Sequence, residues 1–246
     1  MLLLLLAGCS SPSETEIVPP QPEFTAPGLS GDPIDHRIYA DVDPNINAIW
    51  IEWKPDTTHT TTGYLLRRSL DSAVGGDGVL SDSAILIAKL ETTDQTIEPL
   101  PTSYRDTAQI FPGATYFYQL QPYHRSPSGT LTYGKPTHVD LSTSYHYTEP
   151  VQPYAPTGPM KVPVSGITFS WHDPKEGGTF QLIVERLDTE KYVLSDVFPE
   201  YGKDQQKQYD ASQLLLMPNG SYRWRIKRII LNGGSSSRWT AFAILP

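Results

Sequence analysis

Two stretches with one pattern decide the architecture: FPGATYFYQL at Phe111–Leu120 and MPNGSYRWRI at Met217–Ile226. Each opens with a turn containing Pro and Gly and continues into a segment in which apolar side chains recur at every second residue. In the first stretch, Tyr116, Tyr118 and Leu120 fall on one face. A period of two residues is typical of a β-strand with one buried face. The sequence therefore predicts the same kind of strand twice, once in each half of the chain.

The similarity between the halves extends upstream of these stretches. In the first half an alternating segment ends at Trp53 and is followed by Pro55, and in the second half one ends at Trp171 and is followed by Pro174. Proline removes a backbone donor and therefore marks the end of a strand. The two halves are predicted to contain one domain type each.

Composition supports a β-rich globular protein. The 246 residues include 23 Pro and 18 Gly, with 38% hydrophobic and 19% charged residues. This is too apolar for a disordered chain, and abundant turn residues favour many short strands. The net charge of −8 argues against nucleic acid as a partner, because that role needs a basic surface. The best candidate for a helix is the short segment Tyr209–Met217.

The ordered set of motifs resembles the fibronectin type III domain. In that family a Trp ends the second strand, a Tyr opens the third, and a Pro-Gly turn leads into the sixth; in the second copy Phe180 replaces this Tyr. The corresponding positions here are Trp53, Tyr64 and Pro112–Tyr116 in the first copy, and Trp171, Phe180 and Pro218–Tyr222 in the second. The resemblance implies an all-β fold of two immunoglobulin-like β-sandwiches in tandem, with no inherent catalysis. It also implies that Tyr116 and Tyr222 form tyrosine corners.

The N-terminus resembles a bacterial lipoprotein signal. Four leucines precede Leu6-Ala7-Gly8-Cys9, which is similar to the lipobox. The resemblance implies that residues 1–8 are removed and that Cys9 carries the lipid that anchors the protein in a membrane. Ser10 resembles the outer-membrane sorting signal, so a cell-envelope location is expected. The sequence departs from the pattern because no basic residue precedes Arg37. The alternative is an ordinary signal peptide or a buried N-terminal strand with an incidental cysteine.

The remaining chain divides at segments rich in proline and small residues. Residues 9–31 are predicted to be a disordered tether, and residues 144–156 an interdomain linker. Residues 32–143 and 157–246 are then the two fibronectin type III-like domains, each close to the length of about 100 residues expected for such a sandwich.

The search for chemistry predicts a non-enzyme with no cofactor and no metal. The usual hydrolase, phosphate-binding and zinc motifs are missing from the sequence, and the six histidines are scattered. Asp41–Asn45 looks like the opening of a calcium loop, with Glu52 at the twelfth position when Asp41 is counted as the first. Ile46 stands where that loop needs Gly, so a polar turn is favoured. The glycine-rich segment Gly75–Gly78 is either a binding loop or a flexible surface loop with no binding role, and the second is favoured.

Arg223, Arg225 and Lys227 are one set of candidate binding residues. They alternate with apolar residues and should share one face of a strand, where they could meet an anionic envelope polymer. The favoured alternative is cross-strand pairing with Glu185.

Trp50, Tyr145 and Tyr147 are the second set of candidate binding residues. Trp50 alternates out of the apolar face of its strand, and the two tyrosines lie in the predicted linker, as does Tyr154. Exposed aromatic rings could stack on sugars or anchor a protein partner, or they could pack between the domains.

These features predict a non-catalytic, lipid-anchored envelope protein that binds or spaces an unknown protein or glycan partner. Two alternatives stay open: a structural subunit of a secretion or motility assembly, and an accessory subunit for extracellular carbohydrate degradation. The sequence does not distinguish a periplasmic from a surface-facing orientation.

Overall fold

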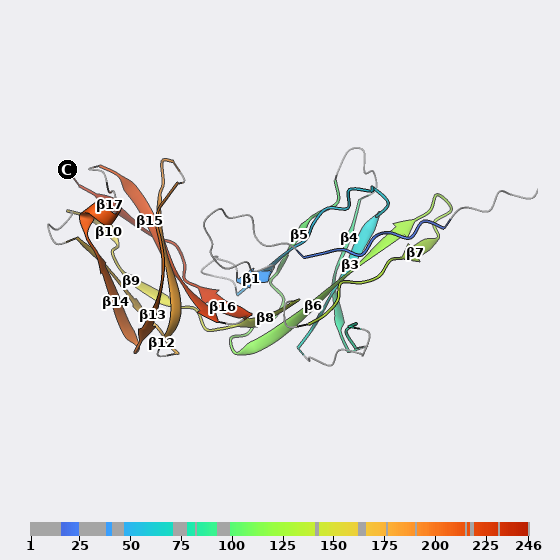
Figure 1. Cartoon of the computed structure of the whole chain (residues 1–246), viewed down its shortest axis with the longest axis horizontal. Helices are drawn as coiled ribbons and strands as arrows, with labels where there is room; N and C mark the ends of the chain where they lie inside the picture. Colours follow the sequence, from blue (N-terminus) through green and yellow to red (C-terminus); the bar gives the residue numbers. More distant parts are fainter. Residues whose placement is uncertain are drawn as a thin grey trace, which may run out of the picture.

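The structure is a computed structural model in which most of the chain is described. The described residues are 16–24, 38–40, 47–70, 78–81, 83–92, 99–140, 143–161, 166–175, 177–189, 191–214, 216, 219–230 and 232–245. The predicted signal peptide, Cys9, the calcium-like segment Asp41–Asn45 and Gly75–Asp77 lie outside them. Two β-sandwiches follow one another along the chain and lie end to end (Figure 1).

The first sandwich packs one antiparallel sheet against another. One sheet has the order β1-β2-β5. The other runs β4-β3-β6-β8, with β7 paired to the far end of β6. The strands are β1 Ile38–Ala40, β2 Ile49–Glu52, β3 Gly63–Ser69, β4 Ile85–Glu91, β5 Ser103–Asp106, β6 Ala114–Arg125, β7 Leu131–Tyr133 and β8 Ser144–Tyr147.

The second sandwich repeats this plan. One sheet has the order β9-β11-β14, and in the other β12 lies between β13 and β15, while β15 also pairs with β16 and β17. A parallel strand, β10, pairs with β17. The elements are β9 Gln152–Ala155, β10 Gly158–Met160, β11 Ile167–His172, β12 Gly177–Arg186, β13 Lys191–Tyr201, β14 Asp204–Tyr209, α1 Ala211–Leu214, β15 Ser221–Ile230, β16 Gly233–Ser236 and β17 Thr240–Ile244.

This strand order confirms the predicted all-β fold of two immunoglobulin-like sandwiches of the fibronectin type III kind. Each copy has seven strand positions, with β10 as an additional strand outside this count. The first, second and fifth positions, which are β1, β2 and β5 in one copy and β9, β11 and β14 in the other, form one sheet. The third, fourth, sixth and seventh positions form the other sheet. In each copy the seventh position is divided into two short strands, β7 with β8 and β16 with β17. The short α1 lies inside the segment predicted as the best helix candidate.

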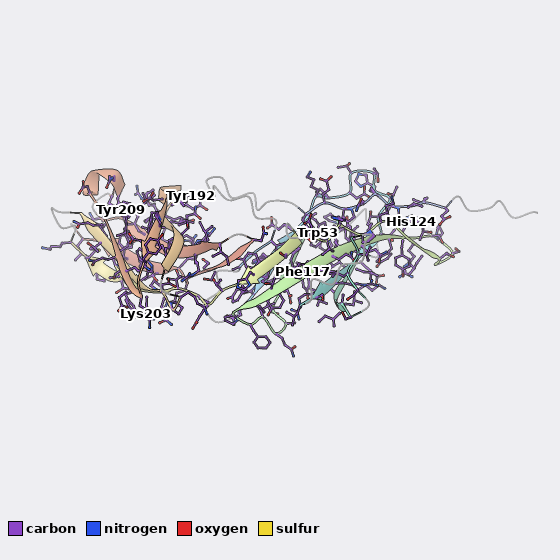
Figure 2. The ribbon with its side chains drawn as sticks, turned by 60° about the horizontal axis from the view of Figure 1, so that its bottom comes forward. Trp53, Phe117, His124, Tyr192, Lys203 and Tyr209 are labelled. Atoms are coloured by element: carbon purple, nitrogen blue, oxygen red, sulfur yellow. The ribbon has the colours of Figure 1, made fainter. Side chains whose placement is uncertain are left out.

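Each sandwich has its own aromatic core. Trp53 and Trp171 are 2% and 0% exposed and occupy equivalent places in the two cores. Trp53 meets Tyr64 edge to face, with ring centroids 5.7 Å apart. Figure 2 places Trp53 in one sandwich and Tyr209 in the other. The alternation read from the sequence therefore identifies the buried face of these strands.

The tyrosine corner predicted at Tyr116 is present. The backbone N–H of Phe111 donates to the Tyr116 hydroxyl at 2.6 Å, and that hydroxyl donates to the carbonyl of Gln109 at 3.2 Å. The ring is fully buried. These bonds attach the turn before β6 to the strand itself. In the second sandwich the equivalent Tyr222 is also fully buried and stacks on Phe242, with centroids 5.3 Å apart.

Each core also contains a buried ion pair. Arg68 Nη1 lies 2.7 Å from Asp106 Oδ2, which also accepts a hydrogen bond from the Tyr118 hydroxyl at 2.8 Å. In the second sandwich Arg228 pairs with Asp173. Removing one partner of such a pair strongly destabilises the fold, because the remaining charge would be buried without a counter-charge.

The segment predicted as a linker is mostly β-structure. Tyr145 and Tyr147 lie in β8, which pairs with β6, and residues 152–155 form β9, which pairs with β11. Prolines at 150, 153 and 156 suggested a linker, but the alternation Tyr145-His146-Tyr147 places two aromatic rings in the first core. Only residues 148–151 lie between the last strand of one domain and the first of the next.

Part of the predicted tether is docked. Phe24 forms a β-bridge with Trp53 and is 3% exposed, and the Lys54 N–H donates to the Glu23 carbonyl at 2.9 Å. Gln21 Nε2 donates to the carbonyl of Pro136 at 2.6 Å. Residues 16–24 therefore belong to the first sandwich and run along its outside (Figure 1). The segment has no alternating apolar pattern and contains three prolines, so its sequence gives only a weak signal of docking, which explains the error.

We expect Tyr116→Phe to destabilise the first sandwich by about 1–3 kcal/mol, because it removes both hydrogen bonds of the tyrosine corner. Urea unfolding measures the change. Tyr133→Phe is the matched control, since Tyr133 is 49% exposed and the same change there should be nearly neutral. Equal stability of the two variants would contradict the structural role of the corner.

Candidate functional site

The joint between the domains is formed by backbone pairing. Strand β16 of the second sandwich pairs in parallel with β8 of the first, with Gly233 opposite His146 and Gly234 opposite Tyr147. Strands β8 and β16 lie side by side at the junction (Figure 1). In the described part of the chain, eleven strands therefore belong to one sheet that continues from the first domain into the second.

Hydrogen bonds extend this ladder on both sides. The His146 N–H donates to the Asn232 carbonyl at 2.8 Å, and the Thr148 N–H donates to the Gly234 carbonyl at 2.9 Å. Ser235 Oγ donates to the carbonyl of Glu149 at 3.0 Å. A flexible linker would leave these backbone groups to water, whereas here they are bonded to the neighbouring domain.

Gly233 allows the close approach of the two domains, and Gly234 allows the tight turn of β16 against β15 in the second domain. A Cβ atom at Gly233 would overlap the carbonyl oxygen of His146, and one at Gly234 would overlap the carbonyl oxygen of Arg228. Gly234 also has a φ of +141°, which side chains disfavour. Sequence reasoning missed this site, although the run Gly233–Ser237 was a visible signal.

The basic residues predicted on one strand lie on the outward face of β15. Arg223 is opposite Glu185 on β12, and its Nε and Nη2 both lie 2.7 Å from Glu185 Oε2. This confirms the favoured cross-strand pairing. Arg225 is only 4% exposed, and Lys227 is partly buried. The stripe therefore presents less free positive charge than its sequence suggests.

Trp239 covers this stripe. The guanidinium carbons of Arg223 and Arg225 each lie 4.5 Å from the centroid of the Trp239 ring. Such cation–π contacts contribute about 0.5–2 kcal/mol each, depending on desolvation. The ring fixes the two arginines against the sheet at the start of β17. This arrangement accounts for the stripe as a stabilising feature of the second sandwich.

The candidate aromatic residues are not brought together. Tyr145 and Tyr147 are 4% and 3% exposed, so they cannot contact a partner in this conformation. Tyr147 donates from its hydroxyl to Asn47 Oδ1 at 3.1 Å. Trp50 is partly buried on the outer side of β2, across from Arg105 of β5. Tyr154 is the one of these four that is more than half exposed, at 52%.

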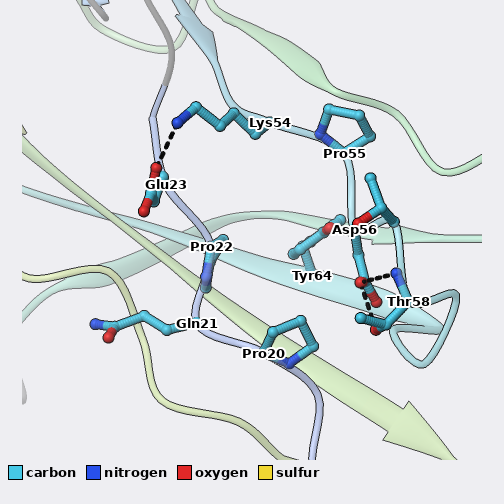
Figure 3. A pocket seen from close by; sticks show the side chains of 10 residues that line it. Pro20, Gln21, Pro22, Glu23, Lys54, Pro55, Asp56, Thr58 and Tyr64 are labelled. Atoms are coloured by element: carbon cyan, nitrogen blue, oxygen red, sulfur yellow. Dashed lines mark hydrogen bonds and ion pairs between the residues drawn. The ribbon is translucent and has the colours of Figure 1, made fainter.

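A groove of about 260 Å³ lies at the end of the first sandwich that is remote from the joint (Figure 3). The docked segment forms one wall with Pro20, Pro22 and Glu23, and the loop after β2 forms the other with Lys54 and Asp56. Lys54 Nζ and Glu23 Oε2 form an ion pair of 2.6 Å between the walls, and both side chains are mostly exposed.

The Asp56 carboxylate organises its own loop. It accepts hydrogen bonds from the backbone N–H groups of Thr58 at 2.8 Å, Thr60 at 3.1 Å and Thr61 at 2.9 Å. Burial acts to raise the pKa of Asp56, but the hydrogen bonds from Thr58 and Thr61 outweigh it and hold this pKa well below its ordinary value. A carboxylate stabilised as the anion in this way is a poor proton acceptor, so it serves as a structural cap of the loop.

The described residues contain no group of three or more His, Cys, Asp or Glu side chains arranged to hold a metal ion. Within the same residues, none of the helical structure is long and apolar enough to cross a bilayer.

Comparisons with known proteins find structural neighbours only. No protein-family model matches the chain, and no curated protein sequence matches it. The FN1–FN3 domains of chicken CNTN1 align with 94% of this chain and 70% of their own, at 14% identity and a TM-score of 0.35. Dimeric latent PorU from Porphyromonas gingivalis aligns with 91% of this chain and 20% of its own, at 12% identity and a TM-score of 0.31. The assignment of the fold rests on the strand order.

We expect Asp56→Ala to lower the urea midpoint of the first sandwich at pH 7, because it removes the cap of the loop after β2. Since folding lowers the pKa of Asp56, its contribution is complete above the ordinary carboxyl pKa of 3.8 and declines as the pH falls below that value. The difference in urea midpoint between Asp56→Ala and the unmodified protein should therefore become smaller in acid. Glu16→Ala, at an exposed carboxylate of the docked segment, is the control. A loss of stability in Asp56→Ala that is the same at all pH values would contradict this account.

Proposed function

We propose that the chain is a non-catalytic, lipid-anchored protein of the cell envelope whose two domains form one extended body that displays a binding surface away from the membrane. The observation that supports this most is the β8–β16 pairing. It joins the two sandwiches through backbone hydrogen bonds, so they are expected to keep one relative orientation. A fixed orientation suits a spacer, because it sets both distance and direction.

The docked segment supports the same proposal. The docked segment begins at the end of the first sandwich that is remote from the second, and the C-terminus lies at the opposite end of the molecule (Figure 1). Seven residue steps separate Cys9 from Glu16 and can span at most about 25 Å. A lipid on Cys9 would therefore hold the first sandwich close to the bilayer and leave the second one farther away.

The rigidity of the joint can be measured by pulsed electron paramagnetic resonance between spin labels at Thr130→Cys and Thr189→Cys, in a Cys9→Ser background. We expect one narrow distance distribution. Gly233→Ala should broaden it, because the added methyl group overlaps the His146 carbonyl and opens the ladder.

Gly202→Ala is the control for backbone strain away from the joint: Gly202 lies in the β13–β14 turn with open space around it but with a φ of +107°, so the methyl group strains this turn without meeting the other domain. It should leave the distribution narrow. A broad distribution in the unmodified protein, or a narrow one in Gly233→Ala, would contradict a rigid spacer.

The anchor has a separate test. Cys9→Ala expressed in a bacterium that processes lipoproteins should move the protein from the membrane fraction to the soluble fraction. Metabolic labelling with a radioactive fatty acid should mark the unmodified protein and not the variant. Persistence of the variant in washed membranes would contradict anchoring through Cys9.

A further inference from the structure

The outer face of the sheet β9-β11-β14 in the second sandwich is polar and nearly uncharged. Thr168 lies opposite Gln208, and Ser170 lies opposite Gln206, in the antiparallel register of β11 and β14. Thr168, Gln206 and Gln208 are exposed, whereas Ile167, Phe169 and Trp171, which alternate with the outward residues of β11, are buried in the core. This face therefore offers a row of hydroxyl and amide groups that can both donate and accept hydrogen bonds.

The few charges around this row are already engaged. Asp204 lies opposite His172 at the end of the sheet, and its Oδ1 is 3.0 Å from His172 Nδ1. Lys207 alternates to the other side of β14, where its Nζ lies 4.4 Å from the ring of Phe198. The outward side chains described on these three strands thus include one acid and no Lys or Arg.

An aromatic platform adjoins the row. Tyr154 of β9 is 52% exposed, and its ring lies beside that of His172, with centroids 6.2 Å apart and planes inclined by 32°. The C–H face of a sugar ring packs well on an aromatic face, while its hydroxyl groups need donors and acceptors nearby. The platform and the row supply these two requirements on one surface.

The charge and polarity of this face indicate which class of ligand it would bind. A protein partner would usually find an apolar centre in its docking surface, and this face has no exposed aliphatic side chain among its described outward residues. An anionic polymer would meet the Asp204 carboxylate, whose side chain is 79% exposed and whose partner on this face is His172, and it would find no Lys or Arg among the described outward residues of the three strands. A neutral polymer of sugars needs no apolar centre and is not repelled by the Asp204 carboxylate.

We propose that the outer face of the sheet β9-β11-β14 binds a neutral polysaccharide, with Tyr154 and His172 as the stacking platform and Ser170 and Gln206 as hydrogen-bonding groups. This proposal rests on the display function above and names the chemical class of the partner. Since the second sandwich would lie farther from the membrane, the face is placed where an envelope or extracellular glycan could reach it.

The test is affinity gel electrophoresis of the purified protein, carrying Cys9→Ser, in gels that contain laminarin, mannan or dextran as neutral probes and alginate or polygalacturonate as anionic probes. We expect retardation by at least one neutral probe and by neither anionic probe. Tyr154→Ala should weaken the binding by about tenfold, which corresponds to roughly 1.4 kcal/mol. Gln206→Ala should weaken it by a smaller factor.

Tyr201→Ala is the matched control, because Tyr201 is 82% exposed but belongs to β13 in the other sheet. Circular dichroism establishes that each variant is folded. Absence of retardation by every neutral probe, equal loss in Tyr154→Ala and Tyr201→Ala, or retardation by the anionic probes would overturn the proposal. Gly233→Ala should keep its retardation, so failure of glycan binding and failure of the rigid joint are separate results.

Discussion

The parallel pairing of β8 with β16 is the constraint on which the arrangement of the whole molecule depends. Strand β8 completes the first sandwich by pairing with β6 and, on its other side, receives β16 from the second sandwich. One strand therefore belongs to two interfaces at once. An unpaired outer side of β8 would be an open sheet edge, which invites association with other chains. The second domain covers this edge and is oriented by doing so.

The cores explain why the sequence predicted the fold so well. Trp53, Tyr116, Trp171 and Tyr222 are large side chains at fixed places relative to turns, and each is almost completely buried. A strand with one buried face must alternate, and a turn with Pro and Gly must interrupt it, so both signals are local and readable. The repetition of the same order of motifs in the two halves made the tandem arrangement readable as well.

The joint and the docked segment could not be predicted from the same signals. Gly233 and Gly234 are required by the closeness of His146 and Arg228, which are distant from them in sequence or lie across a hairpin. Phe24 belongs to no alternating apolar pattern, and its partner, Trp53, is 29 positions away along the chain. The outer face of β9-β11-β14 depends on register between three strands, which a single sequence does not encode visibly. Tyr145 and Tyr147 were assigned to a linker because prolines nearby outweighed a short alternation.

The docked segment has a mechanical consequence. Tension between a lipid at Cys9 and a ligand held by the second sandwich would enter the first sandwich through residues 16–24. The load would fall on the Phe24–Trp53 bridge and on the hydrogen bond from Lys54 to Glu23 before it reached the strands of the core. Detachment of residues 16–24 would add nine residues to the chain between the membrane and the first sandwich, or roughly 30 Å when extended, while leaving the strands of the core in place. The first sandwich thus carries a reserve of chain that could absorb a pull without unfolding its core.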